Sequence, residues 1–201
     1  MGVILSPRQR EGDEEEPDFI KPKFYRGREG PKFRLINFTK DYEYREYQAS
    51  TWIAARVTGQ QYSKAVKIGH SALSKYLNGK NGPEREMNET CPLRTQVIWN
   101  QYLENPGEFI VSLHLPWENQ ENPPSPLNKD LFIQDQPKHF AYVAAFDAMA
   151  NDLSWKENVA SLAHVLDSKG IKYSHEFYYT CRFDHPFRIG KKHNEVIFPA
   201  F

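Results

Sequence analysis

Hydrophobic and polar positions follow two different spacings along this chain of 201 residues. From Tyr62 to Gly79 the apolar or small positions recur every three or four residues, which is the spacing of one helical face. Residues 154–170 repeat that spacing and also end on a glycine, Gly170. Glycine readily adopts the left-handed conformation that ends many helices. The pattern therefore predicts two long amphipathic helices, the second opening on a capping box made by Ser154 and Glu157.

The other patterned segments are short and rich in aromatic and β-branched residues, which favours strands. Phe, Tyr and Trp together form 14% of the chain, and this content supports a β-rich protein. Asn105-Pro106-Gly107 is a strong turn signal between two of the segments. The predicted strands are residues 42–57, 95–102, 108–115, 131–136, 139–146, 176–183 and 194–201.

The predicted elements occur in the same order in the two halves of the chain. Leu73 and Leu77 of the first helix lie 89 residues before Leu162 and Leu166 of the second. We therefore predict an α+β domain with two long helices, in which duplicated βαββ units form a distorted eight-stranded β-barrel or two joined sheets. The expected division is a disordered acidic lead-in at 1–29 and a domain at 30–201, with repeats at 30–115 and 131–201 and a connector at 116–130.

Charge and hydropathy exclude several classes of partner. Lys+Arg and Asp+Glu both total 26, so no net charge draws the chain to nucleic acid, and no nucleic-acid partner is expected. There is no apolar run of the length that a signal peptide or a membrane span needs. Gly2 and Ser6 match a myristoylation pattern, but one acyl chain gives only marginal anchoring. We expect a soluble monomer without stable membrane insertion.

Cys91 and Cys181 are the two cysteines of the chain, and their spacing of 90 residues is neither a disulfide framework nor a metal motif. Two reduced thiols favour a cytoplasmic protein. The alternatives are a mitochondrial location or, if the sequons at Asn37 and Asn88 carry glycans, an extracellular one. Cys181 lies near two histidines, but their spacing fits no zinc pattern and no metal site is expected.

Several motifs together carry a family resemblance over roughly residues 30–198. They are "YEYREYQASTWIAARV" (42–57), "KYLNGKN" (75–81), "TCPL" (90–93), "PPSP" (123–126), "FYYTCRFDHPF" (177–187) and "NEV" (194–196). In this order and spacing the set resembles the SOUL haem-binding protein family. The resemblance implies a barrel similar to bacterial effector-binding domains and a non-enzymatic protein that binds haem or a related porphyrin non-covalently.

The resemblance also implies a shallow apolar pocket with the first helix as one wall. The positions that match this wall are Lys67, Ser74 and Lys75, and a lysine beside a haem propionate is chemically reasonable as a point charge. His70 lies on the same helix and is the better histidine candidate for the iron. Each of Lys67 and Lys75, considered alone, is equally well explained as a solvent-exposed surface lysine.

The chain departs from the family at its proposed iron ligand. Some members carry a histidine in the first strand, and the matching position here is Glu46. A carboxylate is a poor substitute for imidazole at haem iron. Cys91 also replaces a small residue of the family motif and could supply a thiolate, although a buried inert thiol is favoured. We therefore expect haem binding without a histidine ligand of the family type.

Two alternatives stay open from sequence. The chain could be a protein-interaction module, or one that binds an apolar effector, and have lost haem. The second helix has the spacing of helices that bind in grooves of partner proteins, but Leu162 and Leu166 are also what the core of this fold requires. No sequence motif places a nucleophile beside a base, so enzymatic activity is not expected.

Overall fold

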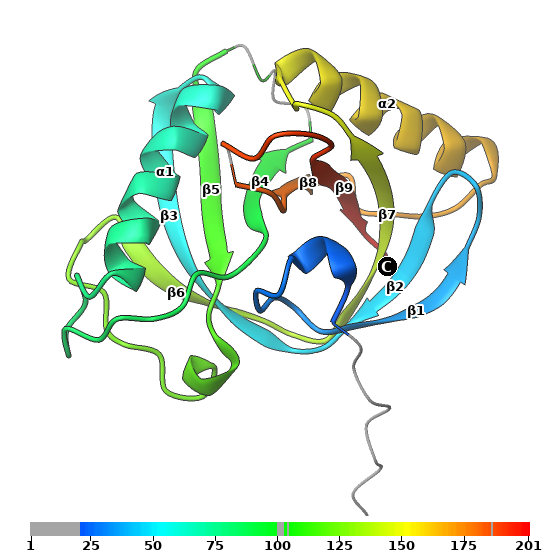
Figure 1. Cartoon of the computed structure of the whole chain (residues 1–201). Helices are drawn as coiled ribbons and strands as arrows, with labels where there is room; N and C mark the ends of the chain where they lie inside the picture. Colours follow the sequence, from blue (N-terminus) through cyan, green and yellow to red (C-terminus); the bar gives the residue numbers. More distant parts are fainter. Residues whose placement is uncertain (1–20, 100–102, 104, 186) are drawn as a thin grey trace, which may run out of the picture.

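A computed structural model describes residues 21–99, 103, 105–185 and 187–201 of the chain. It contains nine strands and two α-helices among these residues, with two short 3-10 helices (Figure 1). The elements in chain order are η1 (Lys23–Tyr25), β1 (Phe33–Phe38), β2 (Glu43–Tyr47), β3 (Ser50–Gln60), α1 (Tyr62–Leu77), β4 (Leu93–Ile98), β5 (Gly107–His114), η2 (Trp117–Asn119), β6 (Leu131–Gln136), β7 (His139–Asp147), α2 (Asp152–Ser168), β8 (Phe177–Arg182) and β9 (His193–Pro199).

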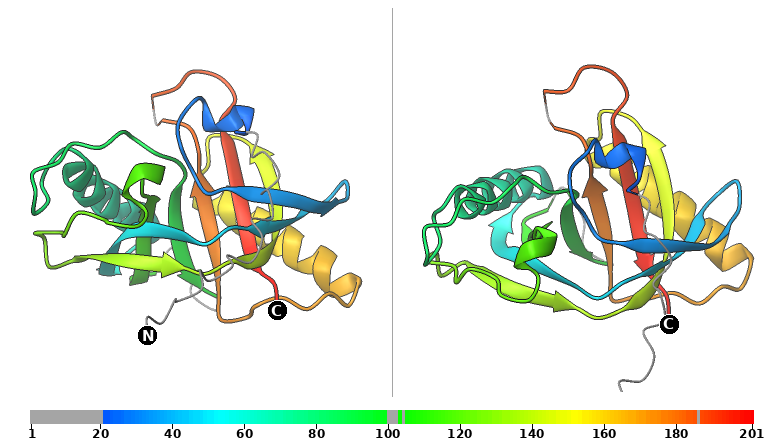
Figure 2. Two further views of the ribbon diagram at one scale, coloured as in Figure 1. Left: turned by 90° about the horizontal axis from the view of Figure 1, so that it is seen from below. Right: turned by 60° about the horizontal axis from the view of Figure 1, so that its bottom comes forward.

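All nine strands belong to one antiparallel sheet with the order β1-β2-β7-β9-β8-β4-β5-β3-β6. The sheet curls back on itself because β2 is followed almost directly by β3, and β6 by β7. These two bent pairs run side by side, so that β2 bonds to β7 while β3 bonds to β6. The result is the curved wall seen in Figures 1 and 2. The predicted α+β fold, a barrel-like sheet with two long helices, is confirmed, but the sheet is a curled half-barrel of nine strands rather than a barrel of eight.

Each long helix covers the outer face of one half of the sheet (Figure 1). Helix α1 packs on β3 and β5, and α2 lies against β7 and β9. Gly79, just beyond α1, has a φ of +84°, the left-handed conformation that its position predicted. The start of α2 differs from the prediction. Its capping box is formed by Asn151 and Ser154, not by Ser154 and Glu157, because Asn151 is the residue that leaves helical backbone.

The apolar face of α2 belongs to the core. Trp155, Leu162 and Leu166 are at most 1% exposed and pack with Tyr62 and Phe198. Moving a large buried side chain out of such a core costs about 2–5 kcal/mol. A partner that took this face would first have to separate α2 from the sheet.

The N-terminal part of the domain is longer than predicted. Residues 21–29, assigned from sequence to a disordered lead-in, include η1, and Tyr25 is 1% exposed. Strand β1 was not predicted. Most of its residues are exposed, so it has no buried face that an alternating sequence pattern would reveal. Residues 1–20, including Gly2, lie outside the described residues, as do 100–102 of the predicted strand 95–102. Neither helix in the described part of the chain is long and apolar enough to cross a membrane.

Candidate functional site

An open groove runs between α1 and the neighbouring strand β3. It holds about 1430 Å³ of space that opens to solvent. Lys67 and Lys75 of α1 line it, together with Lys80 and with Arg56 of β3. Ile68 contributes an apolar side chain that is 44% exposed. The groove therefore combines several cations with a modest apolar surface.

The other two predicted residues of α1 lie in a different depression. His70 and Ser74 face a space of about 510 Å³, which they share with Met87, Glu89 and His185. Burial, with a small contribution from the nearby His185, lowers the pKa of His70, although Glu89 opposes this. Its imidazole is therefore favoured in the neutral form that binds metals. The structure thus separates the four predicted pocket residues into two pairs on two sides of α1.

Glu46 is an ordinary strand carboxylate in an ion-pair network. Arg34 Nη2 lies 2.7 Å from one of its oxygens, and Lys138 Nζ lies 3.0 Å from the other. The hydrogen bond from Lys138, helped by Arg34, lowers the pKa of Glu46 despite some desolvation. Figure 1 shows its strand β2 on the opposite side of the molecule from α1. Glu46 is therefore not part of the groove that Lys67 and Lys75 line.

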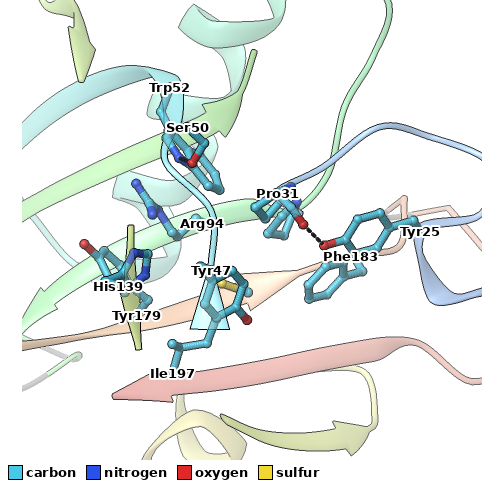
Figure 3. A pocket seen from close by; sticks show the side chains of 12 residues that line it. Tyr25, Pro31, Tyr47, Ser50, Trp52, Arg94, His139, Tyr179, Phe183 and Ile197 are labelled. Atoms are coloured by element: carbon cyan, nitrogen blue, oxygen red, sulfur yellow. Dashed lines mark hydrogen bonds between the residues drawn. The ribbon is translucent and has the colours of Figure 1, made fainter. Parts of the chain in front are cut away.

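A second cavity lies inside the curled sheet, on the face opposite to α1. It is a narrow space, partly open to solvent, with little free room between its lining side chains. Its aromatic lining surrounds one charged group, the guanidinium of Arg94 on β4 (Figure 3). The lining residues are Tyr25, Pro31, Tyr47, Ser50, Trp52, Pro92, Arg94, His139, Tyr179, Cys181, Phe183 and Ile197.

Arg94 is 4% exposed, and its guanidinium has little compensation in the described part of the chain. Nε donates to Ser112 Oγ at 3.1 Å, whereas the buried Nη2 finds no acceptor. The guanidinium carbon lies 3.6 Å from the ring centroid of Trp52 and 4.4 Å from that of Tyr179. Burial lowers the pKa of Arg94, and the groups that oppose this are tyrosines and Cys181, not a carboxylate.

A second buried arginine, Arg45 on β2, is fully paired. Its Nη1 and Nη2 donate to the two oxygens of Glu195 at 3.1 and 2.9 Å, and its Nε donates to Glu43 at 2.7 Å. Glu195 is 0% exposed and also lies 2.9 Å from His193 Nε2. Burial alone would raise the pKa of Glu195, but Arg45 and His193 together hold it below its usual value. This cluster is a closed structural network.

Both cysteines are free and buried. Burial raises the pKa of Cys91 to about 12, and burial likewise raises that of Cys181. Neither sulfur therefore carries the thiolate that a metal or a nucleophilic reaction needs. Across the described ranges, no group of three or more His, Cys, Asp or Glu side chains is arranged to hold a metal ion.

A family model described as SOUL heme-binding protein matches residues 28–199. The chain belongs to the SOUL heme-binding protein family. The resemblance that the sequence motifs carried is thereby confirmed. Heme-binding protein 2 of Homo sapiens is 29% identical over 155 residues, which cover 77% of this chain and 76% of that protein. Heme-binding protein 1 of Xenopus laevis is 30% identical over 164 residues, covering 78% and 82%.

Solved structures share the fold at low sequence identity. The C-terminal domain of EcmrR has a TM-score of 0.60 with 12% identity, covering 79% of this chain and 96% of that domain. A hydrolase from Listeria innocua has a TM-score of 0.51 with 10% identity, covering 80% and 92%. At such identities the likeness establishes the architecture alone.

Sequence reasoning missed the residues of the inner cavity. Arg94 lies in the strand "LRTQVI", where one charge among apolar residues is typical of a strand edge facing water. Arg45 and Glu195 are 150 positions apart, and nothing in the sequence pairs them. The pattern of β2 did contain a signal, because tyrosines and charges alternate on both of its faces.

Proposed function

We propose that this protein binds haem non-covalently in the groove between α1 and β3. The observation that carries the proposal is the placement of Lys67 and Lys75 along one open groove of a chain that belongs to a haem-binding family. The heme-binding proteins 1 and 2 that it resembles support haem as the ligand class. The groove is wide and open to solvent, as a shallow haem pocket would be.

The side chains of the groove fit haem in charge and in shape. Ammonium groups of Lys67, Lys75 and Lys80 can pair with the two propionates. Ile68 and Ala72 offer apolar contact to the macrocycle, and burying such surface contributes about 25 cal/mol per Å². Among the described residues that line this groove there is no histidine, cysteine or methionine. In this placement the lysines and the apolar side chains would hold the haem, and no side chain of these three types would bind its iron.

His70 defines the competing placement on the other side of α1. Its depression contains His70, His185 and Met87, all of which are chemically able to ligate iron. Haem held there would depend on His70 and not on Lys67 or Lys75. The two placements therefore differ in which variants weaken binding and in the absorption spectrum of the iron.

Haemin titration followed at the Soret band tests the proposal. We expect saturable binding in the micromolar range by the wild type, and a loss of at least several-fold when Lys67→Ala and Lys75→Ala are combined. Lys172→Ala is the matched control, because Lys172 is an exposed lysine outside the groove. His70→Ala should leave the spectrum unchanged. Haemin that fails to shift the Soret band, or that responds only to His70→Ala, would overturn the placement in the groove.

A second candidate is a module that has kept the barrel and lost haem. The polar groove wall and the ion-paired Glu46 favour it. In this case Glu46→His would not create a haem site, since β2 lies away from α1 (Figure 1). A gain of haem affinity in Glu46→His would instead point to an ancestral site on β2.

The remaining features of the proposal concern the setting of the protein. We infer a non-enzymatic, monomeric binding protein of the cytoplasm that does not act on nucleic acid. Supporting this, Cys91 and Cys181 are held as neutral thiols, and Leu162 and Leu166 are occupied in the core rather than exposed to a partner. Size-exclusion chromatography with light scattering tests the oligomeric state.

A further inference from the structure

Arg94 is a buried cation that the described protein does not neutralise. Its Nε–H has one acceptor, Ser112 Oγ, while Nη2 is buried and has none. Trp52 and Tyr179 contact the guanidinium through their rings. Such contacts use the face of the guanidinium plane and leave the N–H groups at its edge available.

The unpaired guanidinium of Arg94 lowers the stability of the fold unless an anion pairs with it. Moving a charge out of water is expensive, and buried arginines are normally paired with a carboxylate. The same sheet shows the normal solution at Arg45, which binds both oxygens of Glu195. Among the described residues no carboxylate takes this place at Arg94, whose side chain lines the narrow inner cavity together with Tyr47 and His139 (Figure 3).

We propose that the inner cavity is a binding site for a small monocarboxylate, whose carboxyl group pairs with the Arg94 guanidinium. One guanidinium charge calls for one negative charge, so a dianion such as phosphate would leave an uncompensated charge inside the sheet. A planar carboxylate also matches the forked edge of a guanidinium. The aromatic and apolar lining by Tyr25, Trp52 and Ile197 suits an apolar or aromatic body beyond the carboxyl group.

The cavity also has an approach for such a ligand. Ser50 and His139 are partly exposed and line it at the points where β3 and β7 begin. The imidazole of His139 stacks on the ring of Tyr47 with centroids 5.2 Å apart. The other lining residues are buried, so we expect a ligand to enter beside these two side chains. Because the free space is narrow, the smallest carboxylates fit it best, and a ring requires the lining side chains to shift.

The carboxylate site and the proposed haem groove are physically separate. Successive side chains of β3 point to opposite faces of the sheet. Ile53 clusters with Leu73 of α1, whereas its neighbour Trp52 lines the inner cavity. Lys67 and Lys75 therefore do not reach the inner cavity. The two proposals can be tested independently, because binding at one site does not depend on the other.

Calorimetric titration with sodium benzoate and sodium acetate, at constant ionic strength set with sodium chloride, tests the proposal on the whole chain. We expect saturable binding of benzoate to the wild type and no binding of benzamide, its neutral analogue. Arg94→Met should weaken benzoate at least tenfold, because Met keeps the volume and removes the charge. Arg34→Met is the control, since Arg34 is exposed and outside both sites. Combining Lys67→Ala with Lys75→Ala should leave benzoate binding unchanged.

Two outcomes would overturn the proposal. One is the absence of benzoate and acetate binding to the wild type, which would mean that Nη2 is satisfied by water alone. The other is equal binding by wild type and Arg94→Met. If Arg94→Met does not fold, the wild type still decides, because bound benzoate must give nuclear Overhauser contacts from its ring protons to those of Trp52 and Tyr179. Binding without these contacts would also count against the inner cavity.

Discussion

Arg45 and Arg94 are two buried arginines of the same curled sheet, 2% and 4% exposed, and they are treated in opposite ways. Arg45 binds Glu195 through two parallel hydrogen bonds and adds Glu43 and Tyr47 as further partners. Arg94 has one hydroxyl and two aromatic rings. Burial alone therefore does not say what an arginine is for. The partner atoms around it do.

The difference separates a structural charge from one held ready for a ligand. In a closed network such as that of Arg45, each nitrogen of the guanidinium has an acceptor, and removing Arg45 or Glu195 leaves the other charge without its main partner. Arg94 retains a buried nitrogen without an acceptor among the described residues, and this lowers the stability of the unliganded protein. Substitutions at the two positions should consequently change stability in opposite directions.

The largest expected effect is that of Arg45→Met. Glu195 would remain fully buried without its counter-charge, and breaking a buried pair on one side costs about 3–5 kcal/mol. Urea denaturation of the variant should show this loss. The double variant with Glu195→Leu should recover most of it, because both charges are then absent. A loss in Arg45→Met of less than about 1 kcal/mol, the range of exposed pairs, would mean that the network is not closed.

The second prediction uses the pH dependence of a histidine near the open arginine. Burial, and then the charge of Arg94, lowers the pKa of His114 to about 3, whereas an unfolded histidine titrates near 6.5. The unfolded chain therefore binds the proton more readily between these values, and stability falls as the pH drops from about 6.5 toward 3. At pH 5 the loss relative to pH 7 is about 2 kcal/mol.

Denaturation curves of wild type and His114→Gln at pH 7 and pH 5 measure this contribution. The variant should lose less stability over the same interval, since glutamine does not titrate. Equal pH dependence in both proteins would show that His114 is not held neutral in the fold.

The third prediction concerns Arg94→Met in the absence of any ligand. Removing an unpaired buried charge, with replacement by an apolar side chain that can contact Trp52 and Tyr179, should raise the free energy of unfolding by about 1 kcal/mol. Urea denaturation in chloride buffer measures it. A clear destabilisation would show that the two ring contacts and Ser112 already compensate the charge, and it would remove the contrast with Arg45.

The architecture could be predicted because it depends on local patterns. The three-and-four spacing around Leu73 and Leu162, and the glycines that follow each helix, are readable without knowledge of distant partners. Strand β1 escaped because most of its residues are exposed and it pairs with one neighbour at the edge of the sheet. The start of α2 was misplaced because Ser154 can form a capping box either with Glu157 or with Asn151. The backbone leaves the helical conformation at Asn151, which selects the second pairing.

The site was less accessible to sequence reasoning. The family resemblance placed Lys67, Ser74 and Lys75 on one pocket wall, but it could not show that His70 and Ser74 face another depression. The inner cavity depends on contacts between residues far apart in the chain, such as Arg94 with Tyr179. Which side of a strand faces water is set by the curl of the whole sheet, and no local pattern contains that information.

The smallest effect should come from Glu46, whose ion pairs resemble those of Arg45 in number but not in setting. Its partners Arg34 and Lys138 have side chains that are 59% and 62% exposed, so water and salt compete with both contacts. Glu46→Gln should shift the urea midpoint less than any other variant, and the small shift should vanish in high salt. A salt-resistant loss would show that Glu46 carries a structural charge after all. Glu46 would then be a structural charge like Arg45, and the exposure of its partner side chains would be a poor guide to what an ion pair contributes to stability.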